Sequence, residues 1–230
     1  MDSNVVEVLY NIYHRKLSKV SVEYKRYLYE NINWTSRLIG IKGSRGVGKT
    51  TLLLQYIKCT FADVDNAFYI SLDDLWFKTH SLMELVEYVY THGVTHLFLD
   101  EVHRYPDWSQ ILKNIYDSYS DLYLVYAGSS MLEIDNSKVD LSRRQTVYVM
   151  SGLSFREYLA FEGVIFLAPF SLDDLVSRHV ATAMEITSSI KILPLFEKYL
   201  KNGYYPFYKE AGEDYLLRLQ EVASLVIDAD

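Results

Sequence analysis

Apolar residues follow two periods along this chain, one typical of buried strands and one typical of amphipathic helices. Short apolar runs predict five strands, over residues 37–42, 67–72, 95–100, 121–127 and 146–149. Helical spacing predicts helices around residues 5–13, 24–32, 50–57, 82–89 and 108–119. Strands that alternate with helices indicate an α/β fold, in which a parallel sheet carries helices on both faces.

After Met150 the pattern changes, and only helices are predicted. The first begins near Pro169 and Ser171, the second runs from about residue 189 to a stop at Gly203, and the third covers residues 215–227. We therefore expect a larger domain over residues 1–165 and a small helical subdomain over residues 166–230.

Composition narrows the class of protein. Half of the residues are apolar, yet no run approaches the ~20 apolar residues that a membrane span needs. The polar residues 1–4 do not resemble a secretory signal, and the single Cys59 fits a reducing compartment, so we expect a cytoplasmic protein with no membrane partner. The net charge of −7 argues against broad nucleic-acid binding, and the basic stretch from His14 to Arg26 is expected to be a solvated helix face.

The strongest chemical signal is the stretch Gly43–Thr50, which reads G-x-x-x-x-G-K-T between a predicted strand and a predicted helix. Its glycines let backbone N–H groups surround phosphate oxygens, and the following helix directs its positive dipole end at the same point. We expect Lys49 to reach the β- and γ-phosphates and Thr50 to offer its hydroxyl to Mg²⁺. The predicted ATP contacts are Gly43, Ser44, Arg45, Gly46, Val47, Gly48, Lys49, Thr50 and Thr51.

Two adjacent acids end the third predicted strand, about fifty residues further on. Asp100 is placed to hold the Mg²⁺ that Thr50 also contacts, as a Walker-B acid does. Glu101 is the candidate to orient and deprotonate the attacking water. Acids often end strands, so the pair gains its weight from the P-loop that precedes it.

Small polar residues end the fourth predicted strand. Ser129 and Ser130 follow Gly128 at a strand tip that would face the γ-phosphate, where either hydroxyl could bond the phosphate or the water. The alternative is an ordinary turn that caps the strand. The position after the two nucleotide motifs favours the functional interpretation, which is that of a sensor residue.

These motifs, in this order, resemble one family. The segments Gly43–Thr51, Phe98–Val102, Pro106–Trp108, Ala127–Ser130, Leu141–Arg144 and Ser154–Leu159 are similar to those of the prokaryotic AAA-type ATPases of the AAA_14 group. The resemblance covers roughly residues 25–165. It implies an ASCE-type P-loop ATPase with an extra strand between the P-loop strand and the Walker-B strand, followed by a helical lid. Members usually continue into a C-terminal domain that this sequence does not include.

The resemblance also suggests roles for other side chains. An arginine that neutralises charge on the γ-phosphate is expected at Arg143 or Arg144, of which we favour Arg144. The alternative is that both are loop arginines paired with Asp135 or Asp140. Tyr29 or Trp34 could stack on the adenine, although such aromatics more often belong to the core.

The histidines do not predict a metal site, because Gly93 and two β-branched residues break any helix that would align His92 with His96. His103 lies just past Glu101 and could couple to it, but a surface role is expected.

Two functions of different classes follow. The first is an ATP hydrolase that uses Mg²⁺ and whose cycle moves the lid and a downstream domain. The second is a nucleotide-gated signalling or defence switch that binds ATP or ADP with little turnover. A small-molecule kinase is weaker, because no acceptor pocket or mobile basic lid is recognisable. ATP is the expected ligand in both leading cases, with a protein or nucleic-acid partner bound through the absent C-terminal domain and homo-oligomers as a further expectation.

Overall fold

The chain forms two compact units. The computed structural model describes residues 3–129 and 141–229, and the chain divides into one unit that ends at Ser151 and a second over Gly152–Ala229. The expected boundary was residue 165, so the second unit begins earlier than the predicted subdomain. The reason is local: helix α8 (Phe155–Phe161) packs against α10 (Ile192–Asn202), which places the segment after Ser151 with the C-terminal helices.

The first unit is built on one five-stranded parallel sheet with the order β2-β3-β4-β1-β5. The strands are β1 (Leu38–Lys42), β2 (Ala67–Ser71), β3 (His96–Asp100), β4 (Tyr123–Gly128) and β5 (Thr146–Val149). Each lies within a residue or two of its predicted position. Strand β4 lies between β1 and β3, which confirms the expected extra strand between the P-loop strand and the strand that carries Asp100.

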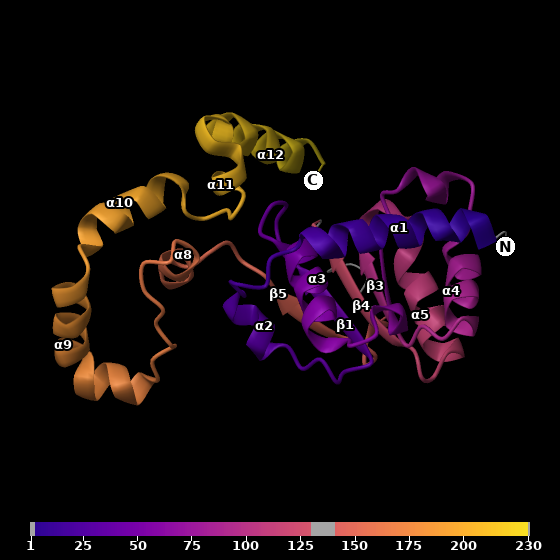
Figure 1. Cartoon of the computed structure of the whole chain (residues 1–230), viewed down its shortest axis with the longest axis horizontal. Coiled ribbons are helices and arrows are strands. Elements are labelled where there is room, and N and C mark those ends of the chain that lie inside the picture. The colour runs from indigo at the N-terminus through magenta and orange to yellow at the C-terminus, as the bar shows by residue number, and fades with distance from the viewer. Residues whose placement is uncertain (1–2, 130–140, 230) are drawn as a thin grey trace. The chain divides into compact units, whose positions relative to one another are not determined.

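Helices cover both faces of this sheet (Figure 1). They are α1 (Ser3–Lys19), α2 (Tyr27–Asn31), α3 (Lys49–Thr60), α4 (Leu82–Thr91) and α5 (Trp108–Ser118), with short 3₁₀ turns η1 (Val64–Asn66), η2 (Leu75–Lys78) and η3 (Val102–Arg104). Helix α1 packs beside α3, and α4 packs beside α5. Crossover connections between parallel strands are right-handed, and the connection from β1 to β2 crosses the sheet in the opposite direction from those that lead from β2 to β4. Helix α3 therefore lies on one face of the sheet, and α4 and α5 lie on the other.

Burial follows from this arrangement. Four residues in a row are buried in each of β1 and β2, as expected of strands covered on both faces. Strand β5 lies at the sheet edge and has no fully buried residue. A close aromatic contact, with 4.6 Å between the ring centroids of Tyr10 and Phe68, packs α1 onto β2. The rigid sheet therefore fixes the positions of the loops that follow its strands.

The second unit is entirely helical. Besides α8 and α10 it contains α9 (Leu172–Ser189), α11 (Tyr208–Ala211), the turn η4 (Gly212–Asp214) and α12 (Tyr215–Ala229). Helices α9, α10 and α12 correspond to the three predicted ones, whereas α8 and α11 were not predicted. Among the described residues, no helix combines the length and the apolar character that crossing a bilayer requires.

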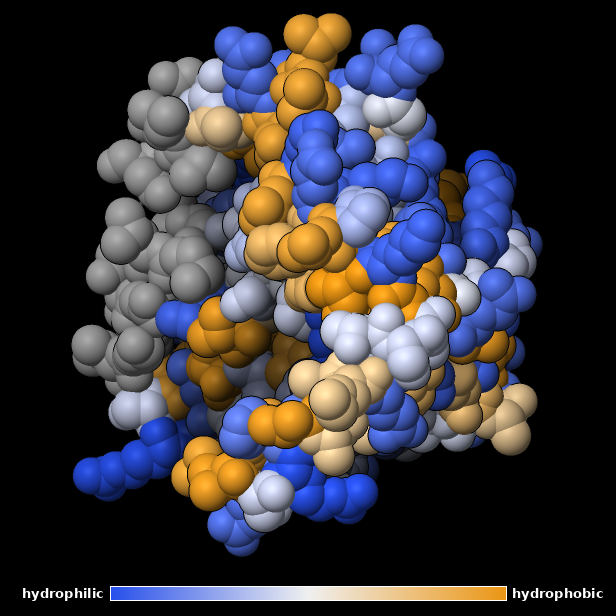
Figure 2. Space-filling model, turned by 90° about the vertical axis from the view of Figure 1, so that its left-hand side faces the viewer, coloured by the Kyte–Doolittle hydropathy of each residue, from blue (hydrophilic) through white to orange (hydrophobic). Residues whose placement is uncertain are grey.

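Helix α9 has no buried residue, although one of its faces is apolar. Leu172, Val176, Val180 and Met184 are all largely exposed. Apolar side chains reach the surface on the face that Figure 2 shows, where they form orange areas. The hydrophobic pattern therefore predicted helix α9 correctly, but the apolar side chains of this helix are exposed.

Candidate functional site

The loop Gly43–Gly48 joins the carboxyl end of β1 to the first turn of α3. Gly46 and Gly48 have φ angles of 85° and 99°, a region that side-chain-bearing residues rarely adopt. Gly48 caps α3, so the free N–H groups of the first helical turn open toward the loop. A helix start of this kind, preceded by a glycine-rich turn, is a binding site for phosphate groups.

Not every residue of the motif faces solvent. Arg45 is exposed, and Ser44, Gly46, Gly48 and Thr50 are partly exposed. Val47 is buried, and Gly43 and Lys49 are buried as well, whereas Thr51 is exposed on α3. The predicted nucleotide contacts thus share one loop and helix start, and their individual contacts with ATP stay predictions.

Gly43 packs against the chain that follows β5. A Cβ atom at this position would lie 2.2 Å from the carbonyl oxygen of Met150. The Met150 N–H donates to the carbonyl of Lys42 at 2.7 Å, which holds the two segments together. Only glycine allows this approach, because the atom in the way belongs to the backbone and cannot rotate aside.

Arg26 holds the same loop in place through a hydrogen bond to its backbone. Its guanidinium donates to the carbonyls of Val47 and Ser151, each at 2.7 Å. The residue is only 8% exposed, so the expectation that it belongs to a solvated basic face was wrong. It lies just before α2, and its two acceptors are 21 and 125 residues away along the chain. No local pattern could have revealed this role.

Lys49 lies at the base of the loop with 4% of its surface exposed. Its Nζ donates to the carbonyls of Gly43 and Ser44 at 2.7 and 3.0 Å and to Ser129 Oγ at 3.2 Å. Burial lowers the pKa of Lys49, while the nearby Glu101 and Asp100 oppose that shift. The ammonium group is therefore directed toward the loop, at the position from which a phosphate chain would be reached.

Asp100 ends β3 and is almost fully buried. Its Oδ2 accepts from Thr50 Oγ1 at 2.5 Å and from the hydroxyl of Tyr69 at 2.9 Å, and its Oδ1 accepts from the Glu101 N–H at 3.0 Å. Tyr69, which was not predicted as a site residue, lies on β2 two residues before Ser71, the register partner of Asp100. Burial, followed by the charge of Asp100, raises the pKa of this tyrosine well above its usual range.

The predicted metal ligands fit Mg²⁺ in their chemistry. Thr50 and Asp100 bring a hydroxyl and a carboxylate oxygen together, and Mg²⁺ prefers such oxygen donors. The remaining ligands would be phosphate oxygens and water, as is usual for this ion. The structure thus joins the two residues proposed for the metal.

Glu101 follows Asp100 in a left-handed conformation, with φ 49° and ψ 41°. Such backbone is costly for a non-glycine residue and is concentrated at functional sites. The Ser129 hydroxyl lies 3.2 Å from each carboxylate oxygen of Glu101. Burial and the neighbouring Asp100 raise the pKa of Glu101, and Lys49 and Ser129 oppose that shift.

Ser129 directly follows β4 and connects the two charged groups, because its Oγ lies 3.2 Å from Lys49 Nζ as well. This places one of the two predicted sensor residues beside the predicted general base. Ser130, the other candidate, lies outside the described residues. His103 also reaches this cluster, with its Nε2 3.4 Å from Glu101 Oε2. Its side chain is 11% exposed, so the expected surface role was wrong.

Arg144 is not brought to this cluster. It forms a two-pronged ion pair with Asp117 near the end of α5, at 2.9 and 3.0 Å. The partner is therefore Asp117, whereas Asp135 and Asp140, the partners considered for a purely structural arginine, lie outside the described residues. The adjacent Arg143 has a φ of 66°.

Tyr29 of α2 and Trp34 both pack against Tyr56 of α3. Trp34 stacks on Tyr56 with the ring centroids 3.7 Å apart, and its Nε1 donates to the carbonyl of Tyr29 at 3.0 Å. Tyr56 belongs to the third turn of the helix, well past the loop. The aromatic pair therefore has a packing role, which was the alternative to stacking on adenine.

The geometry agrees with a comparison of family sequences. The family model described as AAA domain, AAA_14, matches residues 35–159 of the 230. This chain belongs to the AAA_14 family. As a member it is an AAA-type P-loop protein of the nucleotide-binding, ATPase type, and the matched region contains the loop, both acids and Ser129.

Two further proteins are similar to this AAA_14 chain. "Uncharacterized protein MJ1637" of Methanocaldococcus jannaschii is 28% identical over 218 residues, which cover 86% of this chain and 46% of that protein. The chain therefore spans less than half the length of this curated relative. The S. cerevisiae Hsp104–ADP complex matches with a TM-score of 0.51 and 18% identity, over 93% of this chain and 32% of that one. The second likeness is one of fold alone.

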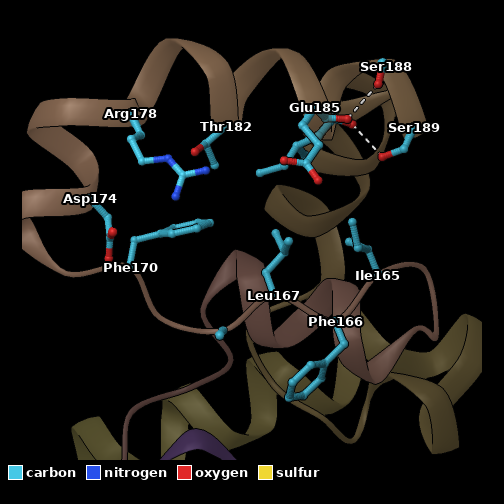
Figure 3. A pocket seen from close by; sticks show the side chains of 12 residues that line it. Ile165, Phe166, Leu167, Phe170, Asp174, Arg178, Thr182, Glu185, Ser188 and Ser189 are labelled. Carbon is cyan, nitrogen blue, oxygen red and sulfur yellow. Dashed lines mark hydrogen bonds between the residues drawn. The ribbon is translucent and has the colours of Figure 1, made fainter.

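A hollow of about 470 Å³ lies in the second unit, between α9 and the segment from Ile165 to Phe170. Figure 3 shows Phe170, Arg178 and Glu185 directed toward this space, with apolar side chains on the opposite side. No glycine is among the residues that line it, and its two acids, Asp174 and Glu185, are not adjacent in the sequence. The glycine-rich loop and the adjacent acids Asp100 and Glu101 of this AAA_14 chain belong to the first unit.

Proposed function

We propose that this chain binds ATP with Mg²⁺ at the loop Gly43–Gly48 and hydrolyses it. The observation that carries the proposal is the cluster at the ends of β3 and β4. There the Ser129 hydroxyl lies 3.2 Å from Lys49 Nζ and 3.2 Å from the Glu101 carboxylate, next to the hydrogen-bonded pair Thr50 and Asp100. Hsp104, which shares the fold, is known in complex with ADP.

Each residue of the site has a separate role in the proposed reaction. The loop amides and Lys49 hold the phosphate chain, and Thr50 with Asp100 holds the metal. The chemistry that Mg²⁺ would supply there is neutralisation of charge on the phosphate oxygens. Glu101 orients the attacking water and accepts its proton, while Ser129 donates to the γ-phosphate or to the water. The raised pKa of Glu101 makes this carboxylate a better proton acceptor.

A second function is supported by the same cluster. Both oxygens of Glu101 lie at hydrogen-bond distance from the Ser129 hydroxyl. The carboxylate therefore already interacts with a side chain at the position where it would otherwise accept a hydrogen bond from the attacking water. A chain that keeps this arrangement with ATP bound would be a nucleotide-gated switch with little turnover. Release of Glu101 on binding would give the hydrolase.

The test measures phosphate release and bound nucleotide on the same protein. We expect Glu101→Gln to keep ATP·Mg²⁺ affinity and to lower turnover by the ~10²–10⁴-fold that a lost general base costs. Glu30→Gln, an exposed residue of α2, is the matched control and should behave as the unmodified chain. Equal turnover in the unmodified chain and Glu101→Gln, together with nucleotide retained after purification, would reject the hydrolase in favour of the switch.

The wider role is proposed from the family. In this proposal the second unit closes over the nucleotide as a lid, and a protein or nucleic-acid target is recognised by the part of the longer relatives that this chain does not span. Fluorescence transfer between labels at Cys59 and at an introduced cysteine in α10 would report closure. An unchanged signal on addition of ATP·Mg²⁺ would reject the lid.

A further inference from the structure

His103 lies beside both the general-base candidate and the backbone that follows β4, since its ring contacts Glu101 and Ser129. The turn η3 begins directly after Glu101 and is closed by the Arg104 N–H, which donates to the Glu101 carbonyl at 2.9 Å. This tight turn folds the side chain of His103 back over the carboxylate two residues before it. His103 Nε2 lies 3.4 Å from Glu101 Oε2, and the histidine side chain is 11% exposed.

The second ring nitrogen shows which tautomer the site requires. His103 Nδ1 lies 3.4 Å from the backbone nitrogen of Ser129. A backbone N–H can only donate, so Nδ1 must accept and carries no proton. The neutral ring then has its proton on Nε2, the atom that faces Glu101. The Ser129 backbone thus leaves the proton on Nε2, which lies 3.4 Å from Glu101 Oε2.

Ser129 alone cannot orient Glu101. Its hydroxyl has a single proton, and that proton is shared between two carboxylate oxygens at equal distances of 3.2 Å. Once Ser129 turns to a phosphate, as a sensor residue does, this contact is lost. The donor on His103 would remain, because it comes from the turn that Glu101 itself begins.

We propose that His103 is a positioning residue, which holds the Glu101 carboxylate in the orientation that accepts a proton from water. The proposal rests on the hydrolase function above. His103 itself contacts neither nucleotide nor water in this scheme, and it acts only through Glu101. The left-handed backbone of Glu101 is then explained as the conformation that allows the turn and the contact together.

Kinetics of three variants test the proposal. We expect His103→Leu to lower turnover about tenfold or more, the effect of one lost hydrogen bond to a charged group, with unchanged ATP affinity. His103→Gln keeps an N–H near the position of Nε2 and should recover most of the rate. His92→Leu removes an imidazole that stacks on Tyr88 at the end of α4 and should have no effect.

A double variant separates positioning from a general structural effect. Since His103 acts through Glu101, His103→Leu should cause little further loss when Glu101 is already glutamine. Equal losses in the two backgrounds, a glutamine variant no faster than the leucine variant, or full activity of His103→Leu would each overturn the proposal. Melting temperatures of all variants show whether a loss reflects unfolding.

Nitrogen NMR of the histidine ring provides a readout that needs no hydrolysis. In the nucleotide-free chain at neutral pH, we expect His103 Nδ1 to give the signal of an unprotonated nitrogen and Nε2 that of a protonated one. A proton on Nδ1 would overturn the positioning role even if ATP is hydrolysed. A protein that binds ATP but releases no phosphate would instead reject the hydrolase, and the ring signals would still decide the contact.

Discussion

Gly43 offers a sharp test of how the loop is built. In Gly43→Ala the new methyl group would lie 2.2 Å from the Met150 carbonyl oxygen, whereas carbon and oxygen in contact are about 3.3 Å apart. About 1 Å must therefore be taken up by two backbone segments that a hydrogen bond of 2.7 Å holds together. Over-packing of this kind costs about 1–3 kcal/mol. For a chain of this size, that corresponds to a fall in melting temperature of roughly 2–12 °C.

The displaced loop should also bind phosphate poorly. Each hydrogen bond from a backbone N–H to a charged phosphate is worth about 1.5–3 kcal/mol, so the loss of one weakens ATP binding about tenfold or more. Isothermal titration with ATP·Mg²⁺ and thermal unfolding of the same sample measure the two effects. Both should appear together in Gly43→Ala.

Gly93→Ala is the matched control. Gly93 follows α4 with a φ of 95° and has open space around it, so its alanine variant strains the backbone without touching the loop. We expect about 1–2 kcal/mol of destabilisation with unchanged ATP affinity. The reasoning is refuted if Gly43→Ala binds and melts as the unmodified chain does, or if Gly93→Ala weakens ATP binding equally.

Three further variants test other parts of the site. Lys49→Ala should weaken ATP binding strongly without loss of fold, as measured by titration and circular dichroism, and unchanged affinity would contradict the P-loop assignment. Arg26→Met removes the hydrogen bonds to the loop carbonyl of Val47 and to the carbonyl of Ser151, so we expect a loss of about 2–4 kcal/mol of stability and weaker ATP binding, seen in urea unfolding and titration. Arg144→Ala should abolish any rise of specific activity with protein concentration and leave ATP affinity unchanged, whereas a concentration-independent rate in the unmodified chain would argue against a role in a neighbouring subunit.

The strands and the phosphate loop could be predicted because their signals are local. Apolar runs located all five strands, and the spacing of Gly43, Gly48 and Lys49 identified the loop at once. The order of the strands came from the family resemblance, not from the pattern. Glu101 was chosen from its place after Asp100, but its left-handed backbone has no signature in the residues themselves.

The supporting contacts could not be predicted, because they join residues far apart in the sequence. Arg26 reaches Ser151, and Tyr69 reaches Asp100, only after the sheet has formed. His103 is different, since it lies two residues from Glu101. A histidine in a short turn after an acid gives no periodic signal, and its ring accepts from the backbone of Ser129, which follows another strand. The limits of the second unit depend on such contacts too, since α8 packs against α10, a helix far along the chain.

The position of Arg144 limits what this residue can do. It comes just before β5, whose first residue Thr146 pairs with Ile39 near the start of β1, whereas the phosphate loop follows the end of β1. Its partner Asp117 lies beside Tyr116, which in turn contacts Arg37, the residue before β1. Arg144 is thus separated from the loop of its own chain by the length of a five-residue strand, about 15 Å. An arginine at that distance cannot neutralise charge on the phosphate held by the same chain. A finger role therefore requires a second subunit, whose bound phosphate Arg144 of this chain would reach. For that, the ion pair with Asp117 either opens or orients the guanidinium toward the site of the second subunit.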